Sequence, residues 1–274
     1  MVLVGYMDES YSGEKPPLTF GISCLFAFGN EWAWMEMAWK KVLEEKNAEL
    51  LLHGRPPLNR FHTADLNSLS DEFEGWTPDE RTAFVSKCIK KVFGQHESYC
   101  TAYTISLRDV AEVWPEYSKN TFGFAYYTIL KILMLDLGKI IRDYFVTGSK
   151  ITLIHDRCAF DGTLLESFNS VVNDPKFAYK DIFTTIAPMG WEDCVPVQLA
   201  DFTAYEVMKE THRLMPEVMS KKARPRRLSL ASLLARESFL GQAQHIPRES
   251  IVSIRESITA RAKAIIVTES ESVP

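Results

Sequence analysis

Three aspartates in separate parts of the chain stand where folding could bring their carboxylates together. Asp8 follows the apolar run 2–7, and Asp156 follows the β-rich run 151–154. Asp201 lies inside a segment that is apolar nearly all round, where an ionised carboxylate needs a partner, a proton or a metal ion. Grouped carboxylates bind hard divalent cations such as Mg²⁺ or Mn²⁺, and such a centre can activate water against a phosphodiester.

The positions of Asp8 and Asp156 after two strands predict how those strands are aligned. Neighbouring strands lie about 4.8 Å apart, so adjacent parallel strands would bring Asp8 and Asp156 to roughly the 3.5–4 Å scale of a paired-metal site. Successive residues of a strand point to opposite faces, which turns Glu9 and His155 away from that face. An aspartate after a strand is commonly a turn-former or a helix cap, so any one acid alone is more often structural. Their combination favours a metal centre.

The segment that carries Asp201 collects other polar side chains on one stripe of a predicted helix. Gln198, Asp201 and Tyr205 stand at positions i, i+3 and i+7. We expect this stripe to face the strand ends, with Gln198 orienting Asp201 or a bound water.

Several residues near these acids have two interpretations. Glu9 could be a fourth ligand where the strand ends, or alternation could turn it away. Ser10, which follows it, is expected to support the ligands without binding the metal. His62 could contact substrate or move a proton near neutral pH, or it could be a structural loop residue. His155 is more typical of a hydrogen-bonded core histidine than of a ligand.

The elements that must hold these residues alternate between strands and helices. Residues 2–7 and 18–28 indicate a hairpin, and apolar spacings of three and four over 31–52 predict an amphipathic helix. Thr77 and Pro78 form a helix start. Further elements are expected at 99–107 (strand), 120–145 (helix), 151–154 (strand), 164–172 (helix), 181–187 (strand) and 196–208 (helix). This order predicts an α/β fold with a mixed sheet flanked by helices.

Composition limits the class of protein. The 274 residues, 46% of them hydrophobic, are sufficient for a large core. The 31 basic and 36 acidic side chains give a net charge of −5, too mild for binding nucleic acid by bulk charge. Five cysteines without a closely spaced pair fit a reducing compartment. The chain shows neither a signal-like start nor an uninterrupted apolar span, which predicts a cytoplasmic protein without a membrane partner.

The composition changes near residue 215. We predict a domain over 1–214, followed by a basic, partly helical appendage over 215–274 with a polar tail. A basic cluster is usually a solvated surface, but beside an acidic metal centre it could bind nucleic acid. The residues of this cluster are Lys221, Lys222, Arg224, Arg226 and Arg227.

Four motifs together resemble a known family. Met7-Asp8-Glu9-Ser10, Phe61-His62, Ile154-His155-Asp156 and the run 197–205 are similar, in order and approximate spacing, to the bacterial and phage domain-of-unknown-function family 3800. The resemblance covers about residues 1–210. The opening departs from the family pattern, because Tyr11 stands where glycine usually follows.

That family is grouped with the ribonuclease H-like superfamily, and the resemblance has structural implications. It implies a five-stranded mixed sheet with metal ligands on the first strand, a later strand and a helix. The matching residues are Asp8, Asp156 and Asp201. His62 matches a recurrent histidine of the family.

Two hypotheses about function follow. The first is a nuclease that depends on Mg²⁺ or Mn²⁺ held by Asp8, Asp156 and Asp201. The second is a non-catalytic ribonuclease H-like module that binds nucleic acid or a protein in phage or defence biology. The tryptophans before residue 52 could pack within the chain or bury a homodimer surface.

Overall fold

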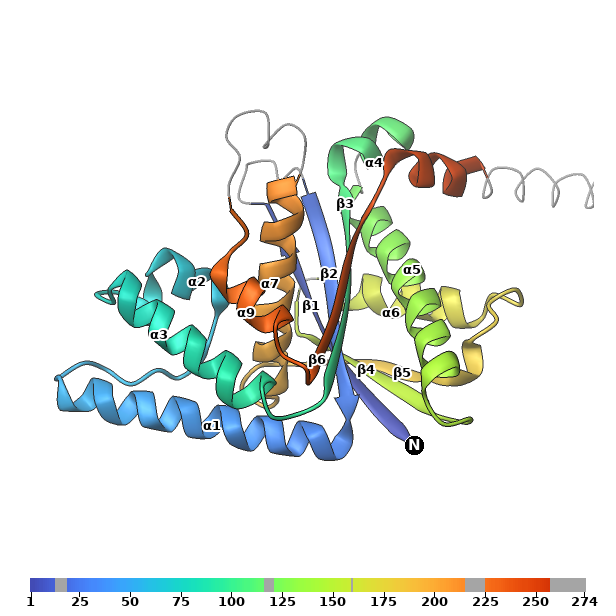
Figure 1. Cartoon of the computed structure of the whole chain (residues 1–274). Coiled ribbons are helices and arrows are strands. Elements are labelled where there is room, and N and C mark those ends of the chain that lie inside the picture. Colours follow the sequence, from blue (N-terminus) through green and yellow to red (C-terminus); the bar gives the residue numbers. More distant parts are fainter. Residues whose placement is uncertain (13–18, 116–120, 159, 215–224, 257–274) are drawn as a thin grey trace, which may run out of the picture.

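A single mixed sheet lies at the centre of the protein (Figure 1). The computed structural model describes residues 1–12, 19–115, 121–158, 160–214 and 225–256. Within these residues the sheet has six strands in the order β5-β4-β1-β2-β3-β6. The strands are β1 (Val2–Tyr11), β2 (Thr19–Phe28), β3 (Ser98–Ser106), β4 (Lys150–Asp156), β5 (Phe183–Met189) and β6 (Phe239–Ile246). The predicted α/β class with a mixed sheet is confirmed.

Helices cover both faces of the sheet, and each face has its own apolar core (Figure 1). The helices are α1 (Gly29–Leu52), α2 (Thr63–Ser68), α3 (Pro78–Cys88), α4 (Leu107–Val113), α5 (Thr121–Tyr144), α6 (Asp161–Val172), α7 (Pro196–Leu214) and α9 (Leu228–Leu234). Helices α4, α5 and α6 contribute to one core, whereas α1, α3, α7 and α9 contribute to the other. Among the described helices, none is both long enough and apolar enough to cross a membrane.

The predicted N-terminal hairpin is present, and its first strand is longer than expected. β1 pairs antiparallel with β2 as far as Tyr11↔Phe20. Asp8 therefore lies inside β1, which corrects the expectation that the strand ends at residue 7. The physical reason is that β2 continues to hydrogen-bond to β1 beyond this point and keeps the polar residues extended.

Local sequence signals predict α3 and α1 correctly. The Thr77 hydroxyl accepts a hydrogen bond from the Glu80 N–H at 3.2 Å, and the Glu80 carboxylate accepts one from the Thr77 N–H at 2.8 Å, which completes a capping box. On α1, Trp32 and Trp39 are buried within the chain, whereas Trp34 is 54% exposed. Of these three tryptophans, only Trp34 offers most of its surface to another protein.

The chain after residue 214 contains helix α9, in line with the expected partly helical segment, and it also contributes strand β6 to the sheet, which was not expected. β6 pairs in parallel with β3 from Ser98↔Phe239 to Ile105↔Ile246. Without β6, β3 would be an exposed edge strand with unpaired backbone groups. The sequence gives little sign of this strand, because only its first and last residues are buried.

Gly138 allows close packing between α5 and the segment before β5. A Cβ atom at this position would lie 2.4 Å from Cγ and 2.5 Å from Cβ of Tyr179. These atoms form the base of the tyrosine side chain, which cannot swing away unless the backbone moves. We expect Gly138→Ala to lower the free energy of unfolding by about 1–3 kcal/mol, measured by urea denaturation.

Gly162→Ala is the matched control, because a Cβ at that position of α6 meets no atom within 4 Å. The control should be neutral or slightly stabilising, since alanine favours a helix more than glycine does. An equal loss of stability in both variants would contradict the packing argument.

Candidate functional site

Asp8 and Asp156 lie at adjacent ends of a parallel strand pair. β1 and β4 pair in parallel as far as Met7↔His155. Asp8 and Asp156 are the next residues along the two strands, and Asp156 is the last residue of β4. The predicted parallel neighbourhood of these two segments is therefore confirmed.

Side-chain alternation divides the strand ends between the two faces of the sheet. The residues two positions before Asp8 and Asp156 contact the core on the α7 side, so these aspartates point toward α7. Glu9 and His155 point to the opposite face, and the Glu9 carboxyl lies beside the hydroxyl of Tyr126 on α5. Of the two interpretations of Glu9, the structure thus favours the one in which alternation turns it away.

Helix α7 carries Asp201 across the ends of β1 and β2. Ser23, the β2 partner of Asp8, shares a hydrogen bond of 3.2 Å with the Thr203 hydroxyl and so holds α7 against the sheet. Asp201 accepts a hydrogen bond from the Thr63 N–H at 2.7 Å. The Asp201 carboxyl also lies close to that of Asp8. The tertiary fold therefore brings a helix acid into contact with a strand acid.

Gln198 anchors the 61–63 segment. Its Oε1 accepts a hydrogen bond from the Phe61 N–H at 2.8 Å, and the residue is 5% exposed. This contact gives Gln198 a structural partner, and the expectation that it orients Asp201 or a bound water stays a prediction. Because Gln198 precedes Asp201 by about one helical turn, the two side chains bind the backbone at Phe61 and Thr63 in succession.

Burial raises the pKa of all three carboxyl groups. The pKa of Asp8 lies well above its usual value because the group is buried and is repelled by Asp201 and other nearby acids. Burial likewise raises the pKa of Asp201, although the hydrogen bond from Thr63 opposes the shift. Burial and then repulsion by Asp201 raise the pKa of Asp156. In the described part of the chain, no lysine or arginine side chain pairs with any of the three.

One pocket, with a volume of about 550 Å³, collects the predicted site residues. Asp8, Asp156 and Asp201 line it together, and Tyr205 lines it from the same stripe of α7, as the helical spacing predicts. The other predicted residues that border this pocket are Glu9, Ser10, His62 and Gln198.

The pocket also contains cationic and aromatic residues that the sequence patterns did not single out. The Arg60 guanidinium carbon lies 5.6 Å from the centre of the Trp191 ring, and Lys209 Nζ lies 5.0 Å from that of Tyr205. Both distances are within the range of a cation–π contact. Arg60 is adjacent to the Phe61-His62 motif, which is the one sequence signal that could have indicated it.

His62 is held by an acid that sequence reasoning missed. Its Nδ1 lies 2.6 Å from Asp65 Oδ2, and its side chain is 42% exposed. His62 precedes α2 but makes no side-chain capping hydrogen bond. With Nδ1 engaged by Asp65, Nε2 is the ring nitrogen left for a ligand, which favours a functional over a purely structural interpretation. The sequence feature that could have indicated this pair is the three-residue spacing between His62 and Asp65.

The chemistry of the three aspartates fits a divalent cation. Their oxygens are the hard donors that Mg²⁺ and Mn²⁺ prefer, and a cation would offset the repulsion that raises their pKa values. Among the described residues, only His155, Cys158 and Asp161 bring three potential ligand atoms within 4.8 Å of one another. The oxygens of the three pocket aspartates are therefore not all within that distance of one another.

The described part of the basic cluster is ion-paired to α7. Arg227 binds Glu206 with N···O distances of 2.9 and 3.0 Å, and Arg226 binds Glu210 at 2.8 Å. These contacts give both arginines a structural role, and their expected contact with nucleic acid stays a prediction. The remaining predicted members, Lys221, Lys222 and Arg224, lie outside the described residues.

Asp8→Asn tests the cost of burying this acid. The folded state holds its proton more tightly than the unfolded chain, so Asp8 lowers stability progressively as the pH rises above about 4. The amide keeps a donor for Asp201 and carries no charge. We expect urea denaturation at pH 7 to show a gain of about 1 kcal/mol or more, since one pKa unit corresponds to about 1.4 kcal/mol.

The gain from Asp8→Asn should shrink as the pH falls toward 4. Asp143→Asn, at an exposed residue near the end of α5, is the matched control. A variant at Asp8 that is less stable than the wild type at pH 7 would disprove the assignment of Asp8 as a destabilising buried acid.

Arg227→Met tests the ion pair with Glu206. The Glu206 side chain is only 1% exposed, so loss of Arg227 leaves a buried charge without a partner. We expect the free energy of unfolding to fall by about 3–5 kcal/mol. Arg226→Met should cost about 1 kcal/mol or less, because Arg226 is half exposed and Glu210 keeps Arg213. Equal losses in the two variants would refute this ranking.

Comparison with known proteins does not assign the site. No protein-family model matches the chain, and no curated protein matches it. The resemblance to family 3800 therefore stays a prediction, and the function has to be inferred from the pocket itself.

Proposed function

We propose that this protein is a divalent-metal-dependent nuclease with a ribonuclease H-like fold. Asp8, Asp156 and Asp201 would hold Mg²⁺ or Mn²⁺, and nucleic acid would be the substrate. The position of these acids on the first strand, its parallel neighbour and a helix supports the proposal, because the resemblance implies the same arrangement. When bound there, the metal would activate a water and stabilise the leaving oxygen of a phosphodiester.

The observation that carries this proposal is the grouping of three partly buried acids without a basic partner. An uncompensated buried charge is costly, and here the cost recurs three times in one pocket. The same chain pairs its structural buried acid, Glu206, with Arg227. The contrast indicates that the pocket acids are compensated by something other than a side chain, and a divalent cation has the appropriate charge and ligand preference.

Other residues of the pocket have roles that suit a nucleic acid. Asp65 holds Nδ1 of His62, so that Nε2 can exchange a proton with the attacking water or the leaving oxygen. Lys209, and Arg60 in exchange for its pairing with Asp65 and Asp71 at 3.4 Å, would supply positive charge for phosphate oxygens. Trp191 supplies an aromatic surface on which a base can stack.

Substitution of the three aspartates tests the proposed activity. Asp8→Asn, Asp156→Asn and Asp201→Asn should each lower Mg²⁺- or Mn²⁺-dependent cleavage by about 100-fold or more, since each removes charge that would act on the transition state. Cleavage is measured on single- and double-stranded RNA and DNA. Glu44→Gln, an exposed change on α1, should leave the rate unchanged.

Unchanged metal-dependent cleavage in all three aspartate variants would remove the assignment. Calorimetry separates the alternative function. Binding of nucleic acid by a wild-type protein that shows no affinity for Mg²⁺ or Mn²⁺ would favour the non-catalytic module.

A further inference from the structure

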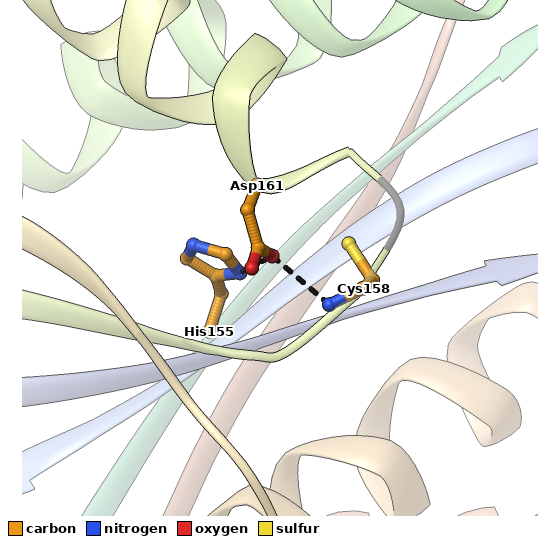
Figure 2. Close-up of side chains that lie close together, drawn as sticks. All are labelled: His155, Cys158 and Asp161. Carbon is orange, nitrogen blue, oxygen red and sulfur yellow. Dashed lines mark hydrogen bonds and ion pairs between the residues drawn. The ribbon is translucent and has the colours of Figure 1, made fainter.

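A second group of potential ligands lies on the other face of the same strand ends. His155 is the penultimate residue of β4, Cys158 lies in the turn that follows, and Asp161 begins α6. Figure 2 shows the His155 ring facing the Asp161 carboxylate, with Cys158 at the other side of the turn. None of these three residues lines the aspartate pocket, although Glu9 borders both groups.

The spacing of the ligand atoms suits a small tetrahedral ion. One ligand atom from each of His155, Cys158 and Asp161 lies within 4.8 Å of the others, and His155 Nδ1 is 3.6 Å from Asp161 Oδ1. Zinc binds nitrogen and oxygen ligands at about 2.0–2.2 Å, so neighbouring ligand atoms of a tetrahedral site are roughly 3.3–3.6 Å apart. The separation of His155 Nδ1 and Asp161 Oδ1 is therefore close to that of a zinc site, although each atom would have to give up its present hydrogen bond, to the Asp156 carbonyl and from the Cys158 N–H respectively.

The surroundings of this group carry negative charge. The Glu9 carboxyl lies against the Cys158 thiol. In the described part of the chain, neither Glu9 nor Asp161 has a lysine or arginine within ion-pairing distance. The buried Tyr126 hydroxyl lies beside the Glu9 carboxyl and near Cys158. The site thus has unbalanced negative charge that a bound cation would compensate.

We propose that His155, Cys158 and Asp161 form a zinc site that fastens the turn between β4 and α6. The mixture of imidazole nitrogen, thiolate sulfur and carboxylate oxygen favours Zn²⁺ over Mg²⁺, which prefers oxygen ligands alone. Glu9 adds a negative charge beside the thiolate. The site does not depend on the proposed nuclease activity, since it uses none of the three pocket aspartates.

Zinc binding changes the protons of this group in a defined way. Without metal, His155 Nδ1 lies 2.9 Å from the carbonyl oxygen of Asp156, where an Nδ1–H can donate. As a ligand, Nδ1 uses its lone pair, so the proton of the neutral ring moves to Nε2 and this hydrogen bond is replaced by the bond to zinc. Cys158 binds as a thiolate and releases one proton. The apparent affinity for zinc should therefore rise with pH.

Cobalt substitution tests the site directly. Purified full-length protein freed of metal should bind one Co²⁺ per chain at this site, with the visible bands of a tetrahedral ion and a thiolate-to-cobalt charge-transfer band in the near ultraviolet. Zn²⁺ should displace the cobalt and abolish both signals. Cys158→Ser should abolish the charge-transfer band and weaken zinc binding by more than about 100-fold, the upper end of the loss caused by outer-shell substitutions.

Two controls separate this site from other thiols and from the pocket. Cys88→Ala removes a buried cysteine from the other core and should leave the cobalt spectrum unchanged. Asp201→Asn should also leave the cobalt spectrum unchanged. The spectrum therefore tests the zinc proposal independently of the nuclease proposal.

A measurement on the wild-type protein tests the proposal even if the Cys158 variant does not fold. Cys158 is the one cysteine of the five that is not buried, so a thiol alkylating reagent should modify it first. Stoichiometric Zn²⁺ should slow this modification by about tenfold or more, because the thiolate is bound. The absence of a thiolate-to-cobalt band, its persistence in Cys158→Ser, or alkylation unaffected by zinc would each overturn the proposal.

Discussion

Parallel pairing between β1 and β4 is the constraint on which the pocket depends. It places Asp8 and Asp156 at neighbouring positions, and side-chain alternation turns both carboxyl groups to the same face. A shift of one residue in this register would reverse the faces and present Glu9 or His155 in their place. The apolar residues that precede these acids are buried on both faces, so the register is specified by the whole core and not by the acids.

The second constraint is the attachment of α7 to the sheet. The Ser23–Thr203 hydrogen bond and the apolar contacts of Phe202 hold the helix over β1 and β2. From this fixed helix, Gln198 and Asp201 bind successive parts of the 61–63 segment. The segment that carries His62 is therefore positioned by the same helix that delivers the third carboxyl group.

Burial of three acids opposes the stability of the fold, and the surrounding structure has to compensate for it. The raised pKa values express this cost, because each charged form is less favourable in the pocket than in water. Two well-packed apolar cores supply the opposing free energy. Residues that lower the stability of a fold but are held in place by their neighbours are typical of a functional site, because residues with only a structural role usually stabilise the fold.

The sequence alone determined the elements and the polarity of their faces. Thr77 with Pro78 marked the start of α3, the tryptophan spacing marked the buried face of α1, and the β-prone runs indicated the strands next to Asp8 and Asp156. These features are local, because capping, helical periodicity and strand alternation each depend on residues close together in the chain.

Only the tertiary structure decided the contacts between distant residues. The bond from Thr63 to Asp201, the bond from Phe61 to Gln198 and the inclusion of Trp191 join segments more than a hundred residues apart. β6 was equally unforeseeable, since its side chains are mostly exposed and its place is set by the backbone groups of β3. Local patterns state which side chains must be buried or capped, whereas the partner of each one depends on how the whole chain packs.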